Sequence, residues 1–200
     1  MVDLIRKDAT STVGGELTNG AQTIAGAKTF TGATTFSSTL TPSGGVVGRT
    51  NGVAVPAGQI GETITSANIV TTTLASLSDT DITNATITLT PGVWRITYQL
   101  TCQMLTASAT NDGGSIYVAM TDNSNNRIAR TNRSMFVRNT GAGTQTPAAT
   151  CLAMDIVISL SVTTTYKLRG QRADNQGVNT ATVQVNANQN DSVFFAVRIA

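Results

Sequence analysis

Asp79 and Asp81, separated by a single threonine, are the closest pair of acidic residues in the chain. Two carboxylates could act as the acid and base of a glycosidase, and oxygen ligands in a loop suit calcium. Flanking serine and threonine residues are more typical of a turn that hydrogen-bonds its own backbone. The sequence contains no histidine, which removes the commonest general base and most zinc ligand sets. We therefore expect no enzyme, cofactor or metal site, and calcium near this pair stays open.

Four arginines follow one another between residues 123 and 140 without an acidic residue among them. Because a guanidinium is a good planar donor to carboxylates, this patch could bind an anionic glycan or a negatively charged capsid surface. The alternative is a set of strand-edge arginines that discourage aggregation. The candidate ligand patch consists of Arg127, Arg130, Arg133 and Arg138.

The two cysteines, Cys102 and Cys151, are expected at inward-facing strand positions, as free buried thiols. A bridge between them is the less favoured alternative. Asp155, on the outer side of its strand, could pair with Arg95 or Arg169, or remain solvated.

Composition narrows the function classes further. The net charge of +2 argues against general nucleic-acid binding, and the sequence lacks both a long apolar run and the apolar region of a signal peptide. Charged residues make up 12% of the chain, and polar, strand-favouring threonines are frequent. We expect an all-β protein that is made in a cytoplasm and is not exported by the usual route.

The elements that would position these groups are strands. After Pro91-Gly92, apolar and polar residues alternate strictly, which predicts a strand with one buried face. Similar segments at 62–69, 85–90, 115–121, 127–130, 134–138, 149–162, 166–172, 181–185 and 192–199 predict an antiparallel β-sandwich of the jelly-roll type over residues 57–200. The expected core of this head comprises Trp94, Ile96, Tyr98, Leu100 and Phe195.

The preceding segment, residues 17–56, has a different pattern. Ile24, Phe30 and Phe36 recur every six residues among small polar residues, so one extended copy has too little apolar surface to offset the entropy of ordering its backbone. Three parallel copies around a threefold axis would supply the missing core, and a disordered linker is the alternative. We expect a β-structured trimeric shaft, followed by a neck from about residue 42.

Two resemblances support this organisation. Residues 22–32, QTIAGAKTFTG, resemble repeated phrases of tailed-bacteriophage fibre proteins, in which such segments form trimeric shafts. The Pro91-Gly92-Val93-Trp94 corner and the apolar final strand resemble the C1q and tumour-necrosis-factor type of jelly roll. That family implies a homotrimer with the final strand near the threefold axis, where Phe194 and Ala196 would suit burial.

The function expected from these observations is structural. The resemblances imply a non-enzymatic bacteriophage virion protein, a short fibre or a capsid or tail decoration protein, with host attachment through a glycan or protein as the alternative. Residues 1–16 would attach it to a phage capsid or tail protein through Val2, Leu4 and Ile5.

Overall fold

The computed structural model describes residues 53–105, 113–138, 148–174, 182–185 and 192–200, and parts of 27–40. The chain divides into two compact units, Met1–Val47 and Gly48–Ala200. In the first unit Phe36 is described, and its side chain is 56% exposed. The other residues predicted for the shaft core and for virion attachment lie outside the described residues, namely Ile24, Phe30, Val2, Leu4 and Ile5.

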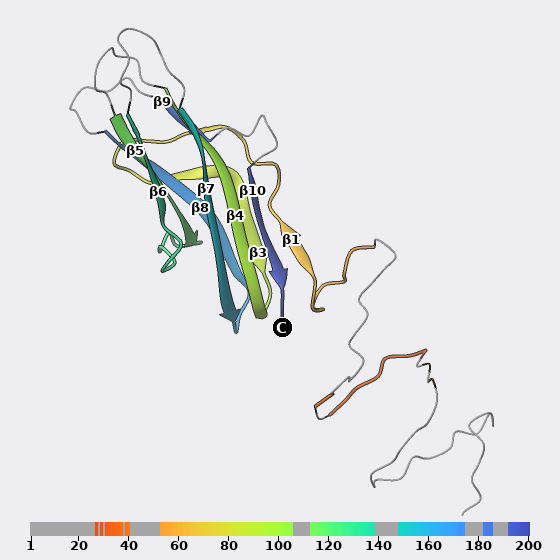
Figure 1. Ribbon diagram of the computed structural model, residues 1–200. Helices are drawn as coiled ribbons and strands as arrows, with labels where there is room; N and C mark the ends of the chain where they lie inside the picture. The colour runs from red at the N-terminus through yellow and green to blue at the C-terminus, as the bar shows by residue number, and fades with distance from the viewer. Residues whose placement is uncertain are drawn as a thin grey trace, which may run out of the picture. The chain divides into compact units, whose positions relative to one another are not determined.

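The second unit is built from strands, and the described residues contain no helix (Figure 1). The strands are β1 (Thr63–Thr65), β2 (Thr72–Thr73), β3 (Thr80–Leu89), β4 (Gly92–Leu105), β5 (Gly113–Asp122), β6 (Arg133–Arg138), β7 (Ala148–Leu160), β8 (Thr164–Asp174), β9 (Thr182–Val185) and β10 (Val193–Arg198).

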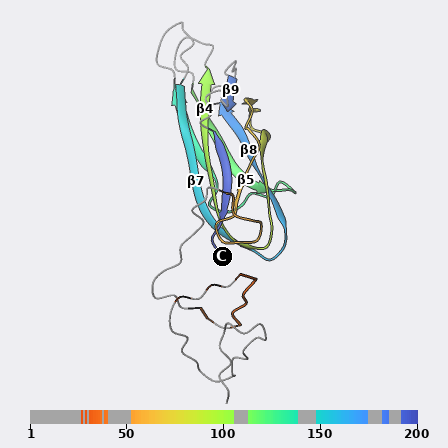
Figure 2. The same ribbon diagram turned by 90° about the vertical axis from the view of Figure 1, so that its right-hand side faces the viewer.

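These strands form two antiparallel sheets, which we call sheet A and sheet B. In sheet A the order is β1-β10-β4-β9-β2, and β7 pairs with the other edge of β4; sheet B has the order β3-β8-β5-β6. Strand β4 is long enough to pair with β10 through Trp94 to Gln99 and with β9 through Cys102 to Leu105. Figure 2 shows β7 alongside β4. The predicted all-β antiparallel sandwich is confirmed.

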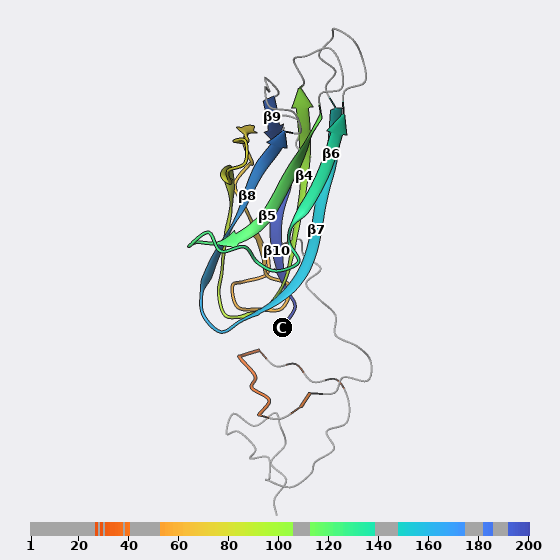
Figure 3. The same cartoon turned by 90° about the vertical axis from the view of Figure 1, so that its left-hand side faces the viewer.

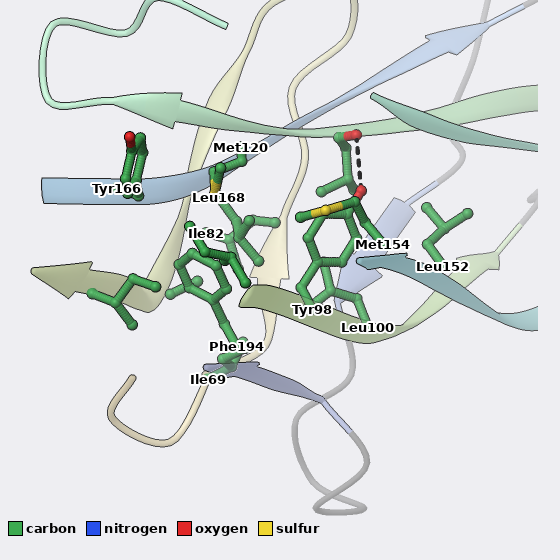
Figure 4. Packing of buried hydrophobic residues seen from close by; sticks show 14 of the residues in the cluster. Ile69, Ile82, Tyr98, Leu100, Met120, Leu152, Met154, Tyr166, Leu168 and Phe194 are labelled. Atoms are coloured by element: carbon green, nitrogen blue, oxygen red, sulfur yellow. Dashed lines mark hydrogen bonds between the residues drawn. The ribbon is translucent and has the colours of Figure 1, made fainter. Parts of the chain in front are cut away.

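The core lies between the inner faces of the two sheets (Figure 4). Strict alternation along β4 buries Trp94, Ile96, Tyr98 and Leu100 completely, as their spacing predicted. The polar groups of Trp94 and Tyr98 both donate hydrogen bonds to backbone carbonyls. The Trp94 indole donates to the Thr90 carbonyl at 2.8 Å, and the Tyr98 hydroxyl donates to the Thr131 carbonyl at 2.9 Å.

Most predicted strands correspond to observed ones, with two differences in the chain between the longer strands. Residues 127–130, predicted as a strand, form a turn with one isolated bridge from Arg127 to Thr121. The positive φ of 66° at Arg130 is incompatible with an extended strand. The two-residue strand β2 is too short for an alternating pattern to reveal.

The assignment of faces in the final strand was wrong. Phe194 and Ala196, predicted at a trimer interface, are completely buried in the core of the sandwich, and Phe195, predicted in that core, lies on the opposite, partly exposed face. Both sides of β10 are apolar, so alternation could not choose between them. Arg198 lies on the same side as Phe194 and Ala196, and its side chain is only 6% exposed.

The buried Arg198 is stabilised by a set of contacts at the lower end of the sandwich. Its Nε donates to Glu62 Oε2 at 2.9 Å, its Nη1 donates to the Pro91 carbonyl, and its guanidinium stacks 4.4 Å from the Trp94 ring centre. Glu62 Oε2 also accepts from the Gly58 amide at 2.7 Å. A buried charge is tolerated when it is paired and hydrogen-bonded in this way, so the arginine is part of the inner face.

Candidate subunit interface

The outer surface of sheet A carries apolar side chains along one strand and an ion pair between the two strands beside it. The register of β10, β4 and β7, which lie side by side, shows which residues are neighbours on this surface. We call it the outer A face, and its central residues are Val193, Phe195 and Val197 from β10, Arg95, Thr97 and Gln99 from β4, and Ala153, Asp155 and Val157 from β7.

Several apolar side chains on the outer A face are in contact with solvent. Val193 is 37% exposed and Val157 is 56% exposed, whereas Phe195 and Val197 are partly buried by their neighbours. In the register Val197 lies opposite Arg95, and Arg95 lies opposite Val157, so aliphatic groups flank the guanidinium on both sides. Apolar side chains thus line β10 and recur at Val157 on the far side of Arg95, and apolar side chains gathered on one exposed face are typical of contact surfaces.

The charges on the outer A face neutralise one another. Arg95 Nε donates to both carboxylate oxygens of Asp155, at 3.0 and 2.9 Å, and Thr97 Oγ1 donates to the same carboxylate at 3.3 Å. The hydrogen bond from Arg95 holds the pKa of Asp155 below its usual value, and the same contact raises the pKa of Arg95. Of the two partners suggested for Asp155, Arg95 is therefore the observed one.

This arrangement can pack against another protein surface without leaving a charge unpaired. A cation or anion without a partner would oppose burial, because desolvation of a lone charge is costly. Here the paired charges lie within a strip of valine, phenylalanine, alanine and threonine. Interface cores are depleted in unpaired charges and enriched in aromatic residues, and the outer A face shares both features.

The acidic pair that could have supported catalysis or calcium binding is involved in ion pairs with basic residues. Asp79 accepts from Arg127 at 2.7 Å, and Asp81 accepts from Lys167 at 2.7 Å and from Arg169 at 2.5 Å. Asp81 lies within β3, so the predicted turn is wrong for this residue. Burial alone would raise the pKa of Asp81, but hydrogen bonds from Lys167 and Arg169 outweigh burial and lower it. Basic partners occupy the oxygens that a cation would need.

Within the described part of the chain, no group of three or more acidic or cysteine side chains is placed to hold a metal ion. The same residues include no helix long and apolar enough to cross a membrane.

The predicted arginine patch is not one surface of available guanidinium groups. Arg127 pairs with Asp79, and Arg133 donates to the carbonyls of Ala153, Arg130 and Asn132. The contact with Ala153 joins β6 of sheet B to β7 of sheet A, because Ala153 lies in β7. Arg130 is exposed in the turn, and Arg138 pairs with Gly113 in the β5–β6 ladder. Arg127 and Arg133 are therefore held by contacts within the sandwich, a role that neither interpretation of the patch had given them.

The cysteines lie on opposite faces of sheet A. Cys102 is completely buried and Cys151 is exposed, and both are free. The prediction that both point inward was wrong for Cys151, since the inward positions of β7 are taken by the neighbouring Leu152 and Met154. Burial raises the pKa of the Cys102 thiol to about 12.

Sequence reasoning missed the functional candidates Val193, Val197 and Val157. For Val193 and Val197 the signal was present, because both faces of residues 193–197, VFFAV, are apolar, which is unusual for a strand with one solvated face. When both sets of alternating residues in a strand are apolar, one set fills the core and the other set, on the outer side, is expected to contact a partner.

Comparison with known proteins gives a limited result. No family model matches this chain, and no curated protein matches it. Among solved structures it is similar to that of the infectious bursal disease virus Gt strain, with 13% identity and a TM-score of 0.33, over 78% of this chain and 42% of that chain. The VP2 subviral particle of the same virus gives 14% identity and a TM-score of 0.32, over 69% and 37% of the two chains.

This chain therefore spans less than half the length of the viral chains it matches. No residue's role in this chain follows from similarity at this level.

Proposed function

We propose that this chain is a non-enzymatic structural protein of a bacteriophage particle, a homotrimeric short fibre or decoration protein. The observation that carries the proposal is the outer A face, where the apolar row Val193, Phe195 and Val197 adjoins the Arg95–Asp155 ion pair. The fibre-like phrase at residues 22–32 and the six-residue period of its large apolar residues support a threefold assembly.

In this proposal the three heads meet through their β10 and β4 strands. Phe195 lies in the middle of the apolar row, opposite Thr97, which itself lies opposite Asp155. Association would bury the ring against a neighbouring copy at a position where no unpaired charge must be desolvated. Phe195 thus takes the interface role that the family resemblance had suggested for Phe194 and Ala196.

The remaining parts of the proposal concern the particle. Residues 1–16, with Val2, Leu4 and Ile5, would bind a capsid or tail protein, and residues 17–56 would form the shaft. The protein would then reside in the virion, with the sandwich projecting outward.

Solution mass tests the assembly directly. Light scattering of the full chain is expected to give about three times 20.7 kDa, and Phe195→Asp is expected to lower that mass because a lone carboxylate would face the neighbouring copy. Thr86→Asp, at an exposed position of β3 in sheet B, is the matched control and should leave the mass unchanged.

Circular dichroism should show that both variants keep the β spectrum of the wild type. A monomeric wild-type chain, or a Phe195→Asp protein of unchanged mass, would rule out this interface.

A further inference from the structure

A second surface, on the opposite side of the sandwich, combines aromatic rings with uncharged polar groups. Strands β8, β5 and β6 run side by side across sheet B (Figure 3). In the register Tyr117 lies between Gln171 and Ser134, and Ser115 lies between Ala173 and Phe136. We call the outer side of these two rows the B strip. The inner side of β5 is separate, because Ile116 and Val118 are buried in the core.

The two rings of the B strip are neighbours on one face. Phe136 lies diagonally from Tyr117 across the β5–β6 pair, and residues in this relation are about 7–8 Å apart at their α-carbons. Phe136 is 55% exposed, and Tyr117 is partly exposed. The Phe136 ring does not contribute to the core, because the neighbouring residue Met135 takes the inward position and packs against the core.

The polar groups of the B strip can make hydrogen bonds to a ligand. Within the described part of the chain, neither the Tyr117 hydroxyl nor the Gln171 amide makes a hydrogen bond to another residue. The hydroxyls of Ser115 and Ser134 lie on the same two rows. Hydroxyl and amide groups both donate and accept, which matches ligands whose own hydroxyls do both.

Two basic residues beside the B strip, both on β8, are neutralised. Arg169 lies on the next row of β8, opposite Ala119, and it donates to Asp81 and to the Asp79 carbonyl. Lys167, one row further, pairs with Asp81 at 2.7 Å. An anionic polymer or a nucleic acid would require uncompensated positive charge, so these neighbours do not favour either.

We propose that the B strip binds a neutral oligosaccharide. The rings of Phe136 and Tyr117 would pack against the apolar C–H faces of pyranose units, while Gln171 and the serines would hydrogen-bond to sugar hydroxyls. A second copy of this chain fits the outer A face better, because the apolar residues there form a longer row. The inference rests on the proposed function, in which the head is the outward part of a particle, and it replaces the arginine patch as the ligand site.

The experiment uses the full chain and an array of neutral oligosaccharides of four to eight sugars, including maltohexaose, cellohexaose and chitohexaose. Polysialic acid and heparin serve as anionic comparisons. At least one neutral glycan should be bound, and Phe136→Ser and Gln171→Ala should each weaken binding at least tenfold. Val162→Ser, at a position between β7 and β8 that is 66% exposed and belongs to neither surface, is the matched control and should leave binding unchanged. Saturation-transfer NMR should show the sugar ring protons next to aromatic protons.

Three results would overturn the inference: no binding to any neutral glycan, binding to the anionic polymers alone, or binding that Phe136→Ser leaves intact. The solution mass of the same samples separates this test from that of the assembly. A trimer without glycan binding removes the B strip proposal alone, and a glycan-binding monomer removes the assembly alone.

Discussion

At the scale of single residues, Arg198 decides how the final strand is oriented. A cation in a strand normally marks the solvent side. Here Glu62 and the Pro91 carbonyl accept its hydrogen bonds, and the Trp94 ring covers its plane. Gly92, at a φ of 147°, leaves the space that the guanidinium fills; a Cβ there would collide with Arg198 and lie 3.1 Å from the Ala200 carbonyl oxygen. The Pro-Gly corner is thus also the place where the buried charge is accommodated.

Removal of one partner of this pair should be strongly destabilising. Arg198→Met leaves the Glu62 carboxylate, whose side chain is 7% exposed, without its cation, and we expect a loss of about 3–5 kcal/mol. The double variant Glu62→Met/Arg198→Met should recover part of this loss, because neither charge is then buried alone. Urea unfolding measures both. If Arg198→Met costs under about 1 kcal/mol, the pair is not essential to the fold.

The Arg95–Asp155 pair gives a prediction about pH. Because Arg95 lowers the pKa of Asp155 in the folded protein, the contribution of this carboxylate to stability is fully present above the unfolded-chain pKa of about 3.9. It is lost as the pH falls through the lower folded value.

Carboxyl NMR should therefore show that the pKa of Asp155 is below the usual value for an aspartate, and Arg95→Gln should move its titration midpoint upward. Asp122, whose pKa is lowered mainly by a hydrogen bond from Asn126, is the internal control and should not move. An Asp155 midpoint that is unaffected by Arg95→Gln would contradict the observed geometry.

At the scale of elements, the inner and outer faces of sheet A can be distinguished by the reactivity of two cysteines, one on β4 and one on β7. Cys102 lies in β4 on the buried side, and its raised pKa of about 12 leaves it protonated at neutral pH. Cys151 lies in β7 on the outer side of the same sheet. Their strands are paired, yet their reactivities should differ.

Alkylation with iodoacetamide should modify Cys151 and leave Cys102 unmodified until the chain is unfolded. If the outer A face is covered in the assembly, Cys151 should also react faster in Phe195→Asp than in the wild type. Mass spectrometry of the modified peptides identifies each site. Labelling of Cys102 in the folded protein would show that β4 does not have the buried face described above.

At the scale of the whole molecule, the two outer surfaces of the sandwich have different chemistry. The outer A face combines an apolar row with a neutralised ion pair, and the B strip combines two rings with amide and hydroxyl groups. The proposed assembly uses the first for contact between copies and leaves the second accessible to a ligand. This division is consistent with a head that is both part of a particle and exposed at its surface.

The proposed attachment to a phage particle belongs to this scale as well. The triple substitution Val2→Asp/Leu4→Asp/Ile5→Asp removes the apolar residues of the proposed attachment segment, so the protein should no longer co-sediment with phage particles that lack their own copy. Its solution mass should match that of the wild type. Co-sedimentation equal to wild type would place attachment elsewhere in the chain.

Alternation of apolar and polar residues was enough to predict the sandwich and the core positions of β4. Where one set of alternating residues is clearly polar, the other set must be the buried face of a strand. Alternation could not orient β10, where both faces are apolar, and a wrong parity exchanges every core residue for a surface one. Spacing along the chain likewise could not pair Arg198 with Glu62 or Asp79 with Arg127, and it could not choose between Arg95 and Arg169 for Asp155, since these residues are distant in sequence. The sheet register and the two-layer packing decided those contacts, and with them which surfaces remain for partners.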